Sequence, residues 1–162
     1  MDPLSIAGSI AGLVAIADIV FSRTYRYAKA VKGAANDIEK LSSEIRSLSG
    51  VLHGLSLVVN ELEKETIEPN LRLHHINSCR TTLTKIQRKL ERNDPATTKD
   101  GLVHAALRSL KWPFSSSETK ELLAEIGRHK ATIGIALSTD NMAGLMRALS
   151  RQDALADGIQ DI

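Results

Sequence analysis

One uninterrupted series of apolar residues, spaced alternately by three and four positions, constrains the fold of this 162-residue chain more than any other feature. The series spans more than three heptads and predicts a long helix over residues 35–64 with a single apolar stripe. Its members are Ile38, Leu41, Ile45, Leu48, Leu52, Leu55, Val59 and Leu62. Because such a stripe must be covered by other elements, we expect a helical bundle.

The remainder of the chain repeats this periodicity and contains no alternating strand pattern. Further helices are predicted at 3–31, 70–92 and 116–150, with a short one at 98–111. Ser115 and Glu118 form a capping box that opens the last long helix. The first helix could break at Ser22–Thr24, and the last could bend at Ser138–Asn141. The expected fold is therefore all-α, an up-down bundle of four long helices plus one short helix.

The length fits a single domain over residues 1–162. We divide it into a hydrophobic N-terminal helix with a basic end (1–33), a bundle (34–152) and a tail (153–162). The residues expected at the centre of the core are Ile45, Leu48, Leu52, Leu55, Cys79, Leu83, Ile86, Ile126 and Ile133.

Two stripes of small residues predict a further contact, because small side chains let helix backbones approach closely. The stripes are Ser5, Gly8, Gly12 and Ala15 in the first helix, and Gly127, Ala131, Gly134 and Ser138 in the last. We therefore expect the first and last helices to dock face to face.

Residues 4–21 carry no Lys or Arg and a single acid, Asp18. As a helix this segment would be about 27 Å long, close to the ~30 Å hydrocarbon thickness of a bilayer. It could therefore lie in the middle of a soluble bundle or enter a membrane. Asp18, two serines and two glycines argue against a permanent anchor. A secretory signal is not expected, because the run is preceded by Asp2 rather than by basic residues.

Basic and aromatic residues alternate directly after this segment, a composition typical of membrane interfaces. The basic residues are Arg23, Arg26, Lys29 and Lys32, and the aromatic ones are Phe21, Tyr25 and Tyr27. The net charge of the whole chain, +2, is too small to indicate a nucleic-acid partner. The single cysteine excludes an internal disulfide and fits a reducing compartment.

A second basic group lies on the helix predicted at 70–92. It consists of Arg80, Lys85, Arg88, Lys89 and Arg92. The usual role of such a group is a solvated helix face, and contact with an acidic lipid or partner is the alternative.

The sequence contains no phosphate-binding loop, HExxH, GxSxG, Rossmann glycine pattern or CxxC. His75 and Cys79 form a lone i,i+4 pair without a third ligand nearby, so no metal site is expected. Cys79 lies within an apolar stripe and is expected to be a small buried hydrophobe. His53, His104 and His129 are expected to be hydrogen-bonded at the edge of the core. We therefore expect neither an enzyme nor a cofactor. An enzyme with an unrecognised catalytic site is one functional alternative, besides the two that are given at the end of this subsection.

Three stretches resemble a known family: MDPLSIAGSIAGLV at the N-terminus, LKWPF at 110–114, and ETKELLAEIGRHKATIGIALS at 118–138. Together they resemble the N-terminal domain of fungal STAND (NLR-like) proteins, in the HeLo-like group. The similarity extends from Asp2 to about Gln152. It implies a HeLo-like fold and a role in programmed cell death. In relatives of this group the hydrophobic N-terminal helix reaches the membrane after oligomerisation.

This resemblance implies that the N-terminal helix permeabilises membranes. The membrane-targeting residues would be Leu4, Ile6, Gly8, Ile10, Gly12, Leu13, Ile16, Ile19, Val20 and Phe21. Arg23, Arg26, Lys29 and Lys32 would contact headgroups.

The implied partners are anionic lipids and further copies of the chain. A NACHT, ankyrin-repeat or amyloid-signalling partner outside this sequence would be the activator. The protein would be cytoplasmic and would move to the plasma membrane on activation. The alternative is a homotypic signalling or oligomerisation module that never enters lipid.

Overall fold

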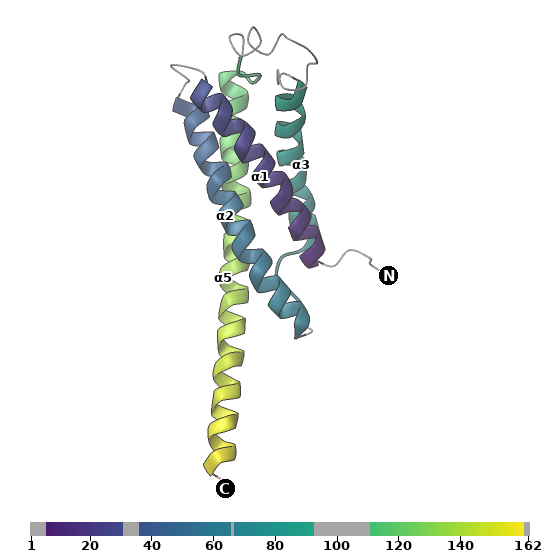
Figure 1. Cartoon of the computed structure of the whole chain (residues 1–162), viewed down its shortest axis with the longest axis vertical. Helices are drawn as coiled ribbons and strands as arrows, with labels where there is room; N and C mark the ends of the chain where they lie inside the picture. The colour runs from purple at the N-terminus through teal and green to yellow at the C-terminus, as the bar shows by residue number, and fades with distance from the viewer. Residues whose placement is uncertain (1–5, 31–35, 66, 93–110, 161–162) are drawn as a thin grey trace.

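The computed structural model describes residues 6–30, 36–65, 67–92 and 111–160 (Figure 1). They form four helices: α1 (Ile6–Ala30), α2 (Asn36–Lys64), α3 (Leu73–Arg92) and α5 (Ser116–Gln160). No strand occurs within these ranges. The all-helical prediction is thus confirmed for the described part of the chain. The short helix predicted at 98–111 lies outside it, apart from residue 111.

The helices run alternately up and down (Figure 1). α1 packs against α2 and α3, and α5 packs against the same two helices. α1 and α5 are therefore at opposite corners of the bundle, which explains why the predicted docking of their small-residue stripes is wrong. A Cβ atom added at Gly127 or Gly134 would meet nothing within 4 Å, so these glycines face open space.

The core follows from the heptad series that runs along α2. All eight of its members are buried, and the nine residues predicted at the centre of the core are at most 1% exposed. Their aliphatic side chains meet those of α1 and α3 in one continuous cluster. Burial of this much apolar surface is the main force that holds the bundle together.

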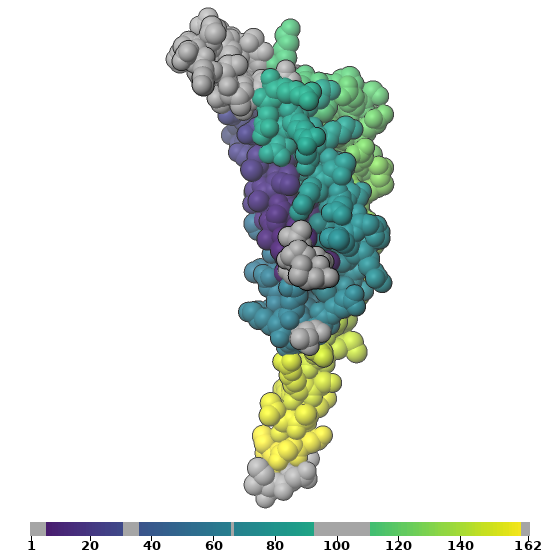
Figure 2. Space-filling model, turned by 90° about the vertical axis from the view of Figure 1, so that its right-hand side faces the viewer, coloured from purple at the N-terminus to yellow at the C-terminus, as the bar shows by residue number. Residues whose placement is uncertain are grey.

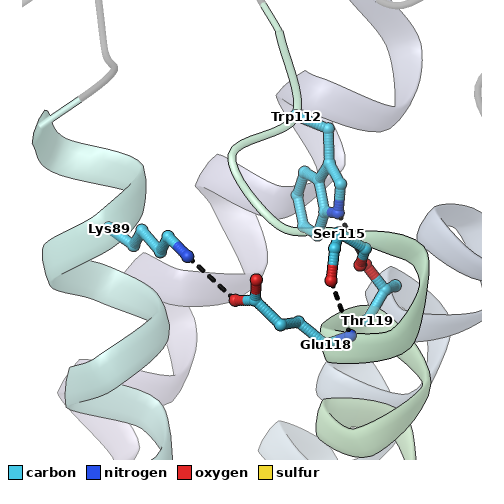
Figure 3. Close-up of polar contacts among 5 residues, drawn as sticks. All are labelled: Lys89, Trp112, Ser115, Glu118 and Thr119. Atoms are coloured by element: carbon cyan, nitrogen blue, oxygen red, sulfur yellow. Dashed lines mark hydrogen bonds and ion pairs between the residues drawn. The ribbon is translucent and has the colours of Figure 1, made fainter.

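The segment Trp112–Phe114 directly precedes α5, and Figure 3 shows Trp112 beside the first turn of that helix. The Ser115 hydroxyl accepts a hydrogen bond of 3.1 Å from the backbone N–H of Glu118, so the predicted helix cap is present. The Trp112 indole donates to Thr119 Oγ1 at 2.8 Å, and its ring meets Tyr27 edge to face. These contacts fix the direction in which α5 enters the bundle.

Two predicted interruptions are absent. α1 continues through residues 22–24, where the Thr24 hydroxyl bonds to the Val20 carbonyl within the helix at 2.7 Å. α5 continues through residues 138–141, because Asp140 faces inward and is only 2% exposed. Its carboxylate accepts hydrogen bonds from the backbone and side-chain nitrogens of Asn70.

α5 also extends beyond its predicted end at residue 150, and residues 153–160 are helical rather than an irregular tail. After Asp140 the helix first passes the end of α2, with which Gly144 and Leu145 line a hollow, and then projects from the bundle, as Figures 1 and 2 show. Leu145 and Leu149 in this part are 56% and 52% exposed.

Candidate functional site

The two sides of α1 differ in side-chain size. The side that faces α2 and α3 carries its bulky residues, namely Ile10, Leu13, Val20 and Tyr27, each at most 1% exposed. The opposite side carries mostly small residues, and the exposed positions include Gly8, Ala11, Ala15 and Ser22. These four side chains are therefore covered in this conformation, whereas Ile19 and Tyr25 are 41% and 43% exposed.

The residues predicted to target membranes are divided between these two sides. Ile10, Leu13 and Val20 are buried, and Ile6, Gly12, Ile16 and Phe21 are half-buried. Gly8 and Ile19 are exposed, and Leu4 lies outside the described residues.

Within the described chain, α1 is the one helix that is long and apolar enough to cross a bilayer, with a mean hydropathy of 1.7 over its best 18-residue window. Length and composition are weak support by themselves, because the core helix of a soluble protein and a signal sequence meet the same test. The polar contacts of α1 are more informative.

At its N-terminal end, α1 is capped by a residue of another helix. The backbone N–H of Ala7 donates to Glu63 Oε1 of α2 at 3.0 Å. The first turn of α1 contains no acid of its own. The carboxylate of Glu63 thus supplies the negative charge that a helix N-terminus favours.

Asp18, the single acid of the apolar segment, binds two residues of α2. The Ser49 hydroxyl donates to Asp18 Oδ1 at 2.5 Å, and His53 Nε2 lies 3.1 Å from Asp18 Oδ2. These three residue types also form hydrolase triads, but there the histidine lies between the acid and the serine. Here the carboxylate is central, so the group joins two helices and has no activated nucleophile.

Arg80 of α3 binds the backbone of α1. Its Nη2 donates to the Ser9 carbonyl at 3.2 Å. A Cβ atom at Gly12 would lie only 3.2 Å from the same nitrogen, so glycine at this position leaves room for the guanidinium. The Arg80 Nε is buried without a hydrogen-bond partner, so the cation is incompletely satisfied.

Two of the predicted headgroup residues make contacts within the protein in this conformation. Arg23 Nη1 lies 3.2 Å from Glu91 Oε1 of α3, an ion pair whose geometry is not that of a hydrogen bond. Lys29 Nζ lies 4.8 Å from the centre of the Tyr25 ring. Arg26 is exposed, and Lys32 lies outside the described residues. Release of α1 would therefore have to separate Arg23 from Glu91.

A second polar cluster joins α3 to α5. Thr82 Oγ1 lies 2.9 Å from His129 Nε2 and 3.2 Å from Glu125 Oε2. Burial lowers the pKa of His129. Glu125 contacts the threonine rather than the histidine, so it does not orient the ring as a catalytic acid would. The expectation of a hydrogen-bonded histidine at the edge of the core is confirmed for His129, whereas His53 is hydrogen-bonded to Asp18 but exposed, and His104 lies outside the described residues.

Cys79 is buried, as predicted, and burial raises the pKa of its thiol to about 12, so the reactive thiolate form is suppressed. No three metal-ligating side chains come together in the described ranges.

Sequence reasoning missed the contacts of Glu63, Ser49, Arg80 and Glu91 with α1. Each comes from a position remote in the chain, and only the isolation of Asp18 in an apolar run indicated that a partner was needed.

Comparison with known proteins gives one family. The family described as "Pigment biosynthesis cluster protein PigL N-terminal" matches residues 1–160, almost the whole chain. No curated protein and no solved structure matches. No match points directly to STAND proteins. The chain therefore belongs to the PigL N-terminal family of pigment biosynthesis cluster proteins.

Proposed function

We propose that this domain is a membrane-active effector, which stores α1 in the bundle and releases it to a lipid bilayer on activation. The observation that carries this proposal is that α1 is long and apolar enough for a membrane and also makes polar contacts with both neighbouring helices. These contacts, here called the polar ties, include those with Glu63 of α2 and Arg80 of α3. The PigL N-terminal family is related to HeLo-like domains, which is consistent with the resemblance to the N-terminal domains of fungal STAND proteins. A role in cell death is part of this proposal.

When α1 leaves the bundle, both its apolar burial and its polar contacts change. Its buried side chains would be costly to expose to water, at about 25 cal/mol per Å² of apolar surface. A bilayer covers the same side chains, so most of that cost is recovered there. The polar ties are not recovered, and these ties therefore determine how readily α1 leaves.

The basic end of α1 offsets part of that loss. Near an anionic leaflet each Lys or Arg contributes about 1 kcal/mol of attraction. Arg23, Arg26, Lys29 and Lys32 provide four such residues within ten positions. Asp18 lies only three residues before the end of the apolar run, so it can remain near the interface rather than at the bilayer centre, where an acid is most costly.

Leakage of dye from anionic vesicles, measured with artificially oligomerised protein, tests this function. The variant Ala11→Lys/Ala15→Lys adds two charges to the exposed side of α1, so the bundle should fold normally while insertion is blocked. The matched control is Ser43→Lys/Ser47→Lys, which adds the same charge to exposed positions of α2. We expect leakage to fall at least about tenfold in the first variant only. Equal leakage by both variants would exclude α1 as the inserting element.

A signalling or oligomerisation module without membrane activity is the second candidate, and the projecting part of α5 favours it. This part carries exposed large apolar side chains on two sides of the helix: Met142, Leu145, Met146 and Leu149 on one, and Leu155 and Ile159 on another. Stable oligomers that never bind vesicles, and that dissociate when Leu149 and Ile159 are replaced by Glu, would support this function over the first.

A further inference from the structure

The solvent face of α3 forms a basic groove. A hollow of about 700 Å³ follows the helix and is lined by five cationic side chains, those of Arg80, Lys85, Arg88, Lys89 and Arg92. Thr81 and Thr84 complete the lining, and no acid of the described chain is part of it. Figure 2 shows this face, with α3 beside α1. All of these lining residues lie on α3, so the hollow is open to solvent along its length.

Three of these cations lack an internal role. Lys89 pairs with Glu118 at 2.8 Å, whereas Lys85, Arg88 and Arg92 make no ion pair with the residues that the structure describes. Lys85 and Lys89, like Arg88 and Arg92, are four positions apart on one helix face. Such like-charged pairs destabilise a helix by about 0.2–0.5 kcal/mol each. The arrangement therefore costs stability, and an anionic ligand would remove that cost.

Arg80 connects this groove to α1. Its guanidinium has five N–H donors, yet the contacts described above are one hydrogen bond to the Ser9 carbonyl and a buried, unpartnered Nε. A phosphate group offers Arg a bidentate, charge-assisted pair, which is stronger than a bond to a neutral carbonyl. A phosphate near Arg80 would therefore compete with α1 for this side chain.

We propose that the α3 groove binds a ligand that carries several phosphate groups, and that the bound ligand withdraws Arg80 from Ser9 and loosens α1. From Arg80 to Arg92 the groove follows about 18 Å of helix, which suits a polyphosphorylated molecule better than a single phosphate ion. The ligand is either a soluble polyphosphate or a phosphorylated lipid headgroup. Only the consequence of loosening α1 rests on the proposed membrane function, because binding itself needs no membrane activity.

Binding is tested by calorimetry with inositol hexakisphosphate at low salt. Arg88→Gln/Arg92→Gln should weaken binding at least about tenfold, since each residue would form a charge-assisted contact. The control Lys40→Gln/Arg46→Gln removes the same charge from exposed positions of α2 and should bind as the wild type does. Equal weakening in both variants, or in neither, would overturn the site.

Vesicles of phosphatidylcholine that contain phosphatidylinositol 4,5-bisphosphate separate the two sources. Groove-dependent binding to these vesicles identifies a lipid headgroup. Groove-dependent binding to the soluble probe alone identifies a free polyphosphate.

Hydrogen exchange measures the coupling to α1. The soluble probe should accelerate exchange of the α1 amides near Ser9 and Leu13 at least threefold in the wild type. In Arg80→Gln these amides should exchange fast without the probe and should not respond to it. Unchanged exchange of α1 in the wild type at saturation would overturn the coupling. Vesicle leakage is measured separately, so the proposed function and this site can fail independently.

Discussion

α1 and the projecting part of α5 are both helical segments with large apolar side chains, but their surroundings are opposite. In α1 most of the large apolar side chains are buried or half-buried, and residues of α2 and α3 bind its polar groups. In α5 beyond Asp140 the large side chains are exposed, and the described tie is Glu65, which pairs with Arg147 and Arg151. These pairs lower the pKa of Glu65, with the hydrogen bond from Arg151 as the largest cause.

The difference shows that apolarity alone does not define a functional surface. α1 has the more apolar sequence, yet among its large hydrophobic side chains only Ile19 and Tyr25 are exposed in this conformation. The projecting part of α5 is exposed in the same conformation. If both surfaces are functional, the exposed apolar side chains of α5 can make contacts without a conformational change, whereas α1 must first leave the bundle.

Breaking the core that supports α1 should have the largest effect. Leu52→Ala empties a fully buried site and should lower the free energy of unfolding by about 2–5 kcal/mol. Leu155→Ala, at a position 69% exposed on the projecting part, should change it by less than about 0.5 kcal/mol. Urea denaturation of both variants measures the contrast. Similar losses in the two would mean that the end of α5 is covered in solution.

The next effect concerns the point at which α5 leaves the bundle. Asp140→Ala removes the buried acceptor of Asn70 and should cost about 1–3 kcal/mol, because a partly buried N–H loses its partner. Asp140→Asn keeps an acceptor oxygen and should cost less. Denaturation midpoints of both variants test this order. A midpoint of Asp140→Ala equal to that of the wild type would show that the contact adds no stability.

Loss of one tie of α1 should have a smaller effect on global stability and a larger one on local opening. Asp18→Asn weakens the bonds to Ser49 and His53, and should cost about 1 kcal/mol because the site is half exposed. Amide exchange in α1 should accelerate, while exchange in α3 should not. Asp153→Asn, an exposed acid of the projecting part, is the matched control. Equal acceleration in α3 would indicate global rather than local opening.

The smallest effect is a pH dependence at the α3–α5 contact. Because burial lowers the pKa of His129 in the folded state, protonation favours the unfolded state. Its contribution to stability is full above the usual value near 6.5 and is lost as the pH falls through the lowered pKa. His129→Gln should flatten this part of the stability profile, measured by thermal unfolding between about pH 7 and 5. An unaltered profile would assign the dependence to other groups.

The sequence predicts the helices because local periodicity and caps specify them. The heptad series of α2 and the capping box at Ser115 were correctly interpreted for this reason. Prediction from the sequence fails where a contact with a residue remote in the chain overrides a local signal. Asp140 resembles a helix breaker in a Ser-Thr-Asp-Asn cluster, yet Asn70 satisfies it inside a continuous helix.

In the candidate site, too, local properties could be predicted from the sequence and contacts between remote residues could not. The apolar character of α1 is a local property, so the sequence identifies the segment, but it does not separate its buried residues from its exposed ones. The small-residue stripes allow close packing but do not specify a partner: Gly12 lies against Arg80 of α3, and Gly127 and Gly134 face open space. The partners of Asp18 and Ser9 are positions 31 and 71 residues away, which no local pattern relates to them.

The placement of the α1 ties has a mechanical consequence. They lie at Ala7, Ser9, Asp18 and Arg23, in order along the helix axis. A force that peels α1 from its N-terminal end loads them one after another, as in a zipper. A force directed along the axis loads all four together in shear. The domain should therefore resist an axial pull much more strongly than a lateral one, and the direction of pulling, more than its strength, would govern whether α1 comes free.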